Sequence, residues 1–543
     1  MKRLNSQTLL LLWFILGLGL RLIHLTTLPP WTDECATIAF SLGNSFLDVP
    51  LDRAISTEIL MQPLQLRPEA TVADVVDRLM AESTHPPLYF IFAHYWMQVF
   101  GEGNVLWAAR SFSALFGAFA IPASYFLSLR AFASPVAAHL AAVLMAVSPF
   151  GVFLSQEARH YTLAVFVSIA SLYCFVVAVE AVRNRKPLAA KWSIAWILVN
   201  GFGIAVHYFF GLVPLSEAWA LGGIWLARKS HRNSVGWRGV VVAALGTAIS
   251  GFAWIPVWQR VAGSNLTDWV YDGGISVDSL VRSIAWIISM LVTFPVDLFA
   301  LSLWLVIVNA FLLLASCIWL VQLLWKSSLP SFPSQHLPIT LSPFLLYLLS
   351  SIVLLLGITY GFGSDLTLAP RFFFPVFPAV VVLAAARIAP RWNSRRWQVF
   401  VVCSLASIGS LSVLGNVSYL QNHRGDRLAR FIAQTSRDVP VLIATTHKHH
   451  GQTGRLMSIA WEFEKIGFSQ PVRFLLARKG ETDNPTETLN RSIVQLPKPF
   501  DVWLVNFHAE EMSDDLQCEE FDDDEFPEIN GYRYNGYRCD TSF

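Results

Sequence analysis

The chain has 543 residues, of which 54% are hydrophobic and only 14% are charged, whereas soluble domains carry roughly 25% charged residues. Its formal net charge of +1 provides no basic face for nucleic acid, so we expect no nucleic-acid partner. Several stretches of about twenty residues lack any charge, and a helix of that length crosses a bilayer core of roughly 30 Å. The composition therefore predicts a polytopic integral membrane protein.

About eleven membrane-spanning helices are expected, because Lys and Arg near the ends of spans stay on the cytoplasmic side. The basic clusters are Lys2-Arg3, Arg130, 183–186, 228–232, Lys326 and 391–396. The spans consistent with all of them run near 8–28, 108–129, 133–150, 161–181, 192–207, 209–227, 238–257, 299–325, 339–360, 372–389 and 397–416. This arrangement predicts an N-terminus inside the cell and a C-terminus outside.

The expected number of membrane spans depends on how three stretches are interpreted. The apolar segments 85–100 and 283–296 would each place a basic cluster on the wrong side if they crossed, so both are predicted to be juxtamembrane or re-entrant. The stretch 192–227 would be about 54 Å long as one helix, which is too long for a single span. It is predicted to turn back near "HYFFG" (207–211).

The fold class expected is thus a membrane all-α bundle, residues 1–416, with a long first outer loop at about 29–107. A small extracytoplasmic α/β domain, residues 417–543, is expected to follow. In it, 439–446 and 500–507 are predicted strands and 454–468 a predicted helix.

Two features mark the end of the predicted α/β domain. Asn535-Gly536, with Tyr on both sides, predicts a two-residue hairpin turn. Cys518 and Cys539 lie in the same hydrophilic tail, where a disulfide is expected if the tail is extracytoplasmic.

The predicted topology brings polar residues from several outer loops and span ends to the extracytoplasmic side. They are Asp33, Glu34, His85, Glu157, Arg159, His160, Tyr161, His207 and Arg371. Transfer of a sugar from a lipid phosphate needs an acid side chain that takes the proton of the attacking hydroxyl, and cations that stabilise the departing phosphate. Arginine suits a phosphate because its planar fork donates two parallel hydrogen bonds.

Within this set, Asp33 is the candidate base and Glu34 a second catalytic acid. Arg371 and Arg159 are the candidate phosphate-binding cations. The remaining candidates for binding substrate or phosphate are His85, Glu157, His160, Tyr161 and His207. A divalent metal cation held by Glu34 and His207 is an open possibility.

The motifs "WTDE", "HPPLYF", "SQEARHYTL", "HYFF" and "PRFFFPVFPA" occur in this order between residues 31 and 379. Their order resembles the GT-C superfamily of polyprenyl-phosphate-sugar-dependent glycosyltransferases, and most closely the protein O-mannosyltransferase and aminoarabinose-transferase group, glycosyltransferase family 39. The resemblance covers roughly residues 8–390. It implies a catalytic role for Asp33, a donor-phosphate role for Arg371 and inversion at the anomeric carbon.

By the same resemblance the chain is a hexosyl- or pentosyltransferase of the bacterial inner membrane. Its active site and C-terminal domain then face the periplasm, and its acceptor is a lipid, glycan or protein hydroxyl. The chain departs from the aminoarabinose branch at His85, where that branch has lysine, which leaves the sugar and the acceptor open.

Other interpretations of these residues remain open. Asp33-Glu34 also fits the first turn of a helix after the Pro-Pro break, and His160 and His207 also fit hydrogen-bonded packing. Glu217, an acid within an apolar span, is a functional candidate, and Arg21 could contact the carrier phosphate or pair with an acid. The alternative function is a secondary transporter of an anionic or sugar-linked substrate.

Overall fold

The computed structural model describes residues 5–227, 233–261, 266, 270–271, 276–295, 303–325, 342–480, 482–509, 512, 516–522 and 526–540. The basic clusters at Lys2-Arg3, 228–232 and Lys326, and the first residues of the spans predicted near 299–325 and 339–360, lie outside them. Contacts between residues divide the chain into two compact units. The helical unit comprises Met1–His24, His85–Tyr89 and Arg110–Leu420, and the α/β unit comprises Leu25–Thr84, Phe90–Ala109 and Gln421–Phe543.

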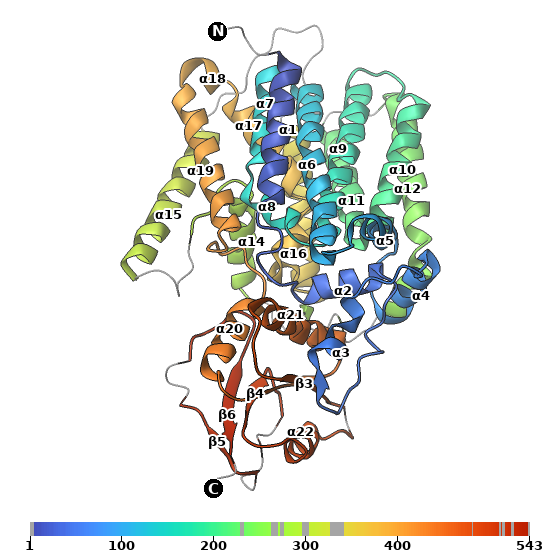
Figure 1. Cartoon of the computed structure of the whole chain (residues 1–543). Coiled ribbons are helices and arrows are strands. Elements are labelled where there is room, and N and C mark those ends of the chain that lie inside the picture. Colours follow the sequence, from blue (N-terminus) through green and yellow to red (C-terminus); the bar gives the residue numbers. More distant parts are fainter. Residues whose placement is uncertain are drawn as a thin grey trace. The chain divides into compact units, whose positions relative to one another are not determined.

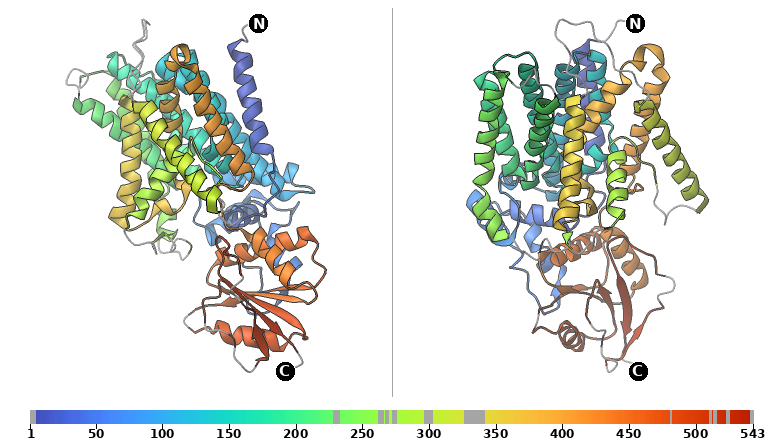
Figure 2. Two further views of the ribbon diagram at one scale, coloured as in Figure 1. Left: turned by 90° about the vertical axis from the view of Figure 1, so that its left-hand side faces the viewer. Right: turned by 180° about the vertical axis from the view of Figure 1, so that it is seen from behind.

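The helical unit is a bundle of long apolar helices that run roughly side by side (Figures 1 and 2). Within the described ranges, seven helices are long and apolar enough to cross a membrane, or up to eight if one bent pair counts as a span. The seven lie on α6 (Val105–Phe132), α9 (Tyr161–Arg183), η2 with α11 (Tyr208–Ala227), α12 (Gly236–Phe252) with its continuation to Val257, α15 (Leu303–Trp325), α16 (Ser342–Phe362) and α19 (Arg396–Leu414). The chain is therefore an integral membrane protein.

The predicted count of eleven spans is not confirmed, although each predicted span falls on a helix. Two of these helices, α1 (Ser6–Leu22) and α10 (Ala190–Val206), have 17 residues each. α17 (Phe377–Ile388) has only 12, because its predicted start folds instead as a separate 3₁₀ turn, η6 (Pro370–Phe373). As predicted, α10 ends at Val206, and a 3₁₀ turn, η2 (Tyr208–Gly211), precedes α11 (Leu212–Ala227).

The two segments interpreted as non-spanning are short helices. α5 (Leu88–Phe100) has 13 residues and α14 (Asp278–Ser289) has 12. At 1.5 Å per residue both are shorter than the roughly 30 Å of the bilayer core. Neither is among the candidate spans.

The span predicted near 133–150 is broken into α7 (Pro135–Ala146) and α8 (Pro149–Ser155), which are bent by 51°. Ser148 caps α8, since its hydroxyl accepts the N–H of Gly151 at 3.1 Å, and Pro149 occupies the first helical position. Proline is tolerated there because it has no N–H to satisfy. The break leaves the last carbonyl groups of α7 without helical partners.

Arg21 supplies those partners. Its buried guanidinium donates to the carbonyl oxygens of Met145 and Ala146 at 2.8 and 2.9 Å, and to the hydroxyl of Ser155 in α8 at 3.1 Å. A fourth bond reaches the Gly17 carbonyl in its own helix at 2.9 Å. Arg21 thus holds the two halves of the broken helix together.

The α/β unit contains a six-stranded sheet in the order β1-β3-β2-β4-β6-β5, part of which is labelled in Figure 1. The parallel centre consists of β2 (Val441–His447), β3 (Val472–Arg478) and β4 (Phe500–Val505). One face packs against α22 (Pro485–Val494) through Leu489 and Ile493. On the other face, Phe431 of α20 (Gly425–Thr435) packs against Trp503 with ring centroids 5.7 Å apart. The predicted strands at 439–446 and 500–507 and the helix at 454–468, here α21 (His450–Ile466), are confirmed.

Part of the first outer loop belongs to this sheet. β1 (Ile55–Ser56) pairs antiparallel with β3 at the sheet edge. α2 (Thr32–Ser41) packs on α21, and the Cys35 thiol donates to the Gly454 carbonyl at 3.5 Å. A Cβ atom at Gly454 would lie 3.0 Å from the Thr32 carbonyl oxygen, so the absence of a side chain permits this close approach.

The predicted hairpin turn at Asn535-Gly536 is wrong. Both residues lie inside β6 (Tyr534–Cys539), which pairs antiparallel with β4 and with β5 (Cys518–Glu520). The turn is made instead by Asn530-Gly531, between the bridge partners Ile529 and Tyr532, with a φ of +88° at Gly531. The C-terminal tail contains two Asn-Gly pairs, and local turn propensity could not say which one the strand pairing would use.

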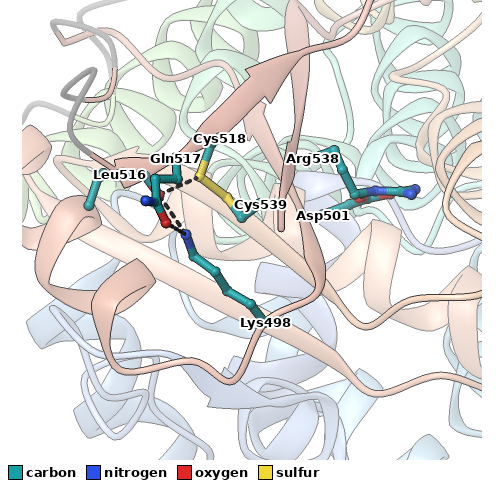
Figure 3. Close-up of a disulfide and its surroundings, with 7 residues drawn as sticks. All are labelled: Lys498, Asp501, Leu516, Gln517, Cys518, Arg538 and Cys539. Carbon is teal, nitrogen blue, oxygen red and sulfur yellow. Dashed lines mark hydrogen bonds and ion pairs between the residues drawn. A yellow bond between two sulfur atoms is a disulfide. The ribbon is translucent and has the colours of Figure 1, made fainter. Parts of the chain in front are cut away.

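The predicted disulfide between Cys518 and Cys539 is confirmed and joins paired residues of β5 and β6 (Figure 3). On the same strand, Arg538 forms an ion pair with the buried carboxylate of Asp501 on β4. Lys498 donates to the Leu516 carbonyl at 2.8 Å. The C-terminal strands are therefore fixed by covalent, ionic and hydrogen-bonded links.

Candidate active site

The helical unit brings together five of the predicted residues from four separate segments, and we call them the His–Arg cluster (His85, Arg159, His160, His207 and Arg371). Arg159 Nη2 lies 3.0 Å from Nε2 of His85. The ring centroid of His160 lies 4.4 Å from that of His207 and 5.3 Å from that of His85. The positive charge of Arg371 acts on both His160 and His207.

The protonation of the cluster follows from its contacts. A guanidinium only donates, so Nε2 of His85 accepts from Arg159. Nδ1 of His207 accepts the N–H of Phe209 at 3.0 Å, which leaves Nε2 to carry the proton of the neutral ring. Burial, and then the neighbouring positive groups, hold the pKa of His160 and His207 well below the usual range. Both rings are therefore neutral near pH 7, and the arginines carry the positive charge.

His160 is the most unusual member of the cluster. Its side chain is fully buried, and neither ring nitrogen has a hydrogen-bond partner in the part of the chain that the structure describes. Leaving one buried polar atom unpaired costs about 1–3 kcal/mol, and such atoms are uncommon in native proteins. Its place among arginines makes an anionic ligand the natural partner for one nitrogen.

Ser113 on α6 fixes the turn that carries Arg159 and His160. Its hydroxyl donates to the Arg159 carbonyl at 2.9 Å and accepts the Arg159 N–H at 3.2 Å. The hydroxyl of Tyr89 lies 2.9 Å from the same oxygen, and Thr162 donates to the Ser113 carbonyl at 2.8 Å. Ser113 is not predictable from the sequence, because one serine within an apolar span carries no signal of its own.

A buried network holds the segment before Arg371. Asp365, which is 2% exposed, forms an ion pair with Arg282 of α14 at 2.6 Å and accepts from Ser279 at 3.0 Å. Its other carboxylate oxygen accepts from the N–H and hydroxyl of Thr367 at 2.9 and 2.6 Å. These bonds fix the 3₁₀ turn η5 (Leu366–Leu368) immediately before the turn that contains Arg371.

Aromatic rings surround the cluster. The Arg159 guanidinium lies 5.9 Å from the ring centroid of Tyr161, and that of Arg371 lies 5.6 Å from the ring centroid of Phe372. Phe374, from the same predicted motif, lies 5.6 Å from His207 between ring centroids. Glu157 is buried in the same turn, and its carbonyl accepts the Arg159 N–H at 2.7 Å. Aromatic faces next to guanidinium groups lower the local dielectric and strengthen a bond to a charged ligand.

The two candidate acids lie in the α/β unit, in the first turn of α2. Glu34 is buried, and its Oε2 accepts the N–H of Trp31 at 3.2 Å, as in a capping box. The side chain of Asp33 is half-buried, and its carbonyl accepts the Thr37 hydroxyl at 2.9 Å. Within α2, Glu34 thus stabilises the helix N-terminus, and the carboxylate of Asp33 is the more accessible of the two.

Glu34 and His207 are the candidate metal ligands. Among the described residues, no group of three or more His, Cys, Asp or Glu side chains is placed to hold a metal ion. The reaction is therefore described without a metal.

Glu217, the acid within an apolar span, lies in α11. Its carboxylate accepts from Ser171 at 2.9 Å and from Nε1 of Trp196 at 3.0 Å. Ser171 also donates to Asn200 at 2.7 Å, so Glu217 belongs to a hydrogen-bonded network between helices.

Residues 84–254 match the family model of dolichyl-phosphate-mannose-protein mannosyltransferases. The resemblance drawn from the motifs is thereby confirmed. The matched segment includes four members of the His–Arg cluster, namely His85, Arg159, His160 and His207. No curated protein matches the chain significantly.

Two kinds of solved structure are similar to the chain. ArnT from Cupriavidus metallidurans bound to undecaprenyl phosphate matches over 99% of this chain and 97% of its own, with 14% identity and a TM-score of 0.47. The archaeal oligosaccharyltransferase AglB from Archaeoglobus fulgidus, in complex with an inhibitory peptide and a dolichol-phosphate, matches over 84% of this chain and 63% of its own, with 12% identity and a TM-score of 0.41.

Proposed function

We propose that this chain is a membrane glycosyltransferase that moves a sugar from a polyprenyl-phosphate donor to an acceptor hydroxyl at the extracytoplasmic face. The observation that carries the proposal is the His–Arg cluster, which gathers two arginines and a buried histidine from distant segments. Neither ring nitrogen of that histidine has a hydrogen-bond partner among the described residues. The family match favours this reaction over secondary transport of an anionic or sugar-linked substrate.

The cluster is suited to a phosphate that leaves with an electron pair. Arg371 and Arg159 donate charge-assisted hydrogen bonds to the phosphate oxygens, and these bonds strengthen as negative charge develops. One nitrogen of the neutral His160 ring donates a further bond. Because phosphate is a good leaving group, the reaction needs no general acid.

Asp33 acts as the general base. It takes the proton of the acceptor hydroxyl while the oxygen bonds to the anomeric carbon, and the bond from that carbon to the phosphate oxygen breaks. Direct attack on one face of the sugar inverts the anomeric centre. The products are the glycosylated acceptor, the protonated carboxyl group and the free polyprenyl phosphate.

The test compares variants of the full chain in a transfer assay with radiolabelled polyprenyl-phosphate sugars. Asp33→Asn should abolish transfer yet bind the lipid phosphate normally, whereas Asp48→Asn, an exposed acid of the same loop, should be active. Arg371→Gln should weaken binding of the lipid phosphate about 10- to 150-fold, the equivalent of a hydrogen bond of about 1.5–3 kcal/mol to a charged group. Full transfer by Asp33→Asn would refute the base, and normal binding by Arg371→Gln would refute the phosphate site.

A further inference from the structure

The C-terminal sheet has a topological switch point that the proposed reaction does not use. From β2 the chain passes through α21 to β3 on one side, and then through α22 back across β2 to β4 on its other side. The strand order therefore reverses between β2 and β4. In open α/β sheets, ligands bind outside the carboxyl ends of the strands at such a point.

Basic side chains gather at this edge. Lys448 follows β2, Lys479 follows β3 and His508 follows β4, and the Lys479 N–H donates to the His447 carbonyl at 2.9 Å. The Lys479 ammonium donates to the His508 carbonyl, which joins the ends of β3 and β4.

Two arginines complete what we call the basic edge (Lys448, Arg455, Lys479, His508 and Arg533). The backbone of Arg533 exchanges hydrogen bonds with Asn506, just after β4, at 2.7 and 2.9 Å. The Arg455 guanidinium, on α21, lies 6.0 Å from the ring centroid of Tyr532. The basic edge thus draws on the ends of all three parallel strands.

Among the residues that the structure describes, no carboxylate neutralises the basic edge. Within the described ranges, none of its lysines or arginines forms an ion pair. The nearby Asp52 pairs with a different residue, Arg478, at 3.6 Å. Like charges held together repel and destabilise the fold unless an anion offsets them.

Arg455 gives the clearest sign of a missing partner. Its Nε atom is buried and has no hydrogen-bond partner among the described residues, and its guanidinium makes only the contact with Tyr532 there. A buried N–H donor without a hydrogen bond is costly. Arg21, by contrast, is fully buried and makes four hydrogen bonds.

We propose that the basic edge is an anion-binding site that takes a phosphate group. The combination of guanidinium and ammonium donors matches the three or four oxygens of a phosphate or phosphomonoester, because arginine binds two oxygens and lysine binds as a point charge. This site is built from residues of the α/β unit alone and is independent of the His–Arg cluster.

Equilibrium dialysis of radiolabelled inorganic phosphate against the full chain in phosphatidylcholine nanodiscs tests the proposal. The double variant Arg455→Gln/Arg533→Gln should weaken phosphate binding at one site about tenfold or more, the loss expected for charge-assisted hydrogen bonds. Arg533→Gln alone, an exposed position, should weaken binding in the same direction without affecting folding. The control is Arg437→Gln, which is exposed and precedes β2 at the opposite edge of the sheet.

The stoichiometry separates this site from the proposed catalytic one. If both exist, the wild type binds two phosphates, and Arg371→Gln and the double variant each lose a different one. If only the basic edge binds, the double variant loses all binding while Arg371→Gln loses none.

A second arm of the experiment identifies the source of the phosphate. If phosphatidic acid added to the nanodiscs displaces the labelled phosphate, the site binds a lipid headgroup. If phosphatidic acid leaves the binding of labelled phosphate unchanged, the site binds a soluble phosphate compound. Equal binding by the double variant, Arg437→Gln and the wild type would overturn the proposal.

Discussion

His160→Phe separates the stability of the cluster from its function. The substitution removes two buried nitrogens that have no partner in the described structure, each of which costs about 1–3 kcal/mol. The phenyl ring is larger than the imidazole ring, and overpacking a filled interior lowers the free energy of unfolding by about 1–3 kcal/mol. We therefore expect the free energy of unfolding without ligand to rise by about 1–3 kcal/mol.

The affinity of the same variant, His160→Phe, for polyprenyl phosphate should fall although its stability rises. The variant lacks the hydrogen bond from His160 to the lipid phosphate, so its affinity for polyprenyl phosphate should fall about 10- to 150-fold, or about 1.5–3 kcal/mol. Thermal unfolding in detergent, with and without polyprenyl phosphate, measures both effects. A gain in stability that accompanies lost function is typical of active-site residues.

The matched control for this prediction is His94→Phe. His94 is also buried, but its Nδ1 lies 2.8 Å from the Ser41 carbonyl, so the change should destabilise by about 1 kcal/mol and leave lipid binding intact. His160→Leu, with a smaller side chain, separates overpacking from the loss of the nitrogens. If His160→Phe unfolds as easily as His94→Phe and binds the lipid phosphate as tightly as the wild type, the reasoning is refuted.

Three other variants test contacts described above. Arg21→Met should lower the free energy of unfolding by about 2–4 kcal/mol, since membrane hydrogen bonds contribute about 0.6–1.7 kcal/mol each. Denaturation in detergent measures this loss, and unchanged stability would contradict the role assigned to Arg21. Asp365→Asn should weaken lipid-phosphate binding several-fold by releasing the turn before Arg371, while thermal unfolding shows an intact fold; unchanged binding would argue against this positioning. Burial, and then a neighbouring histidine, lowers the pKa of His450 from 6.5 to about 4, so the unfolded chain binds more protons between these values. His450 alone should thus contribute about 3 kcal/mol to the rise in stability of the α/β unit from pH 4 to 6.5. His450→Phe should remove this part of the rise in denaturant titrations followed by tryptophan fluorescence.

Much of the fold could be predicted because its signals are local. Runs of apolar residues located the helices of the bundle, and the length of 192–227 required the turn that η2 makes. The central strand β2 begins with four apolar residues in a row, because both faces of a central parallel strand are buried. The exact helix lengths were not predictable, because they depend on where prolines and tertiary contacts end each helix.

Other parts of the fold depend on residues distant in the chain. β1 has only two residues, and its pairing with β3 gives the first outer loop a place in the C-terminal sheet that no local pattern indicates. The choice between two Asn-Gly pairs was made by the partners of β6, whose Asn535 pairs with Leu504 of β4. Register of this kind is set across strands and is absent from any short window of sequence.

The candidate site also has a part that the sequence predicts and a part that it does not. Order along the chain and predicted sidedness selected His85, Arg159, His160, His207 and Arg371, which the structure gathers in one cluster. The residues that hold them, such as Ser113 and Asp365, are ordinary polar residues whose importance exists only through their contacts. Supporting groups of this kind orient the groups that touch the ligand, and a single sequence does not mark them.

Buried cationic and imidazole groups in this protein fall into two kinds, and the difference lies in their partners. The donors of Arg21 reach carbonyl and hydroxyl oxygens that a broken helix leaves available, so its burial is explained by the fold alone. His160 and Arg455 have buried nitrogens for which the described chain offers no acceptor. A group whose desolvation the fold does not offset indicates a ligand, and on that ground His160 is assigned to a lipid phosphate and Arg455 to a second phosphate site.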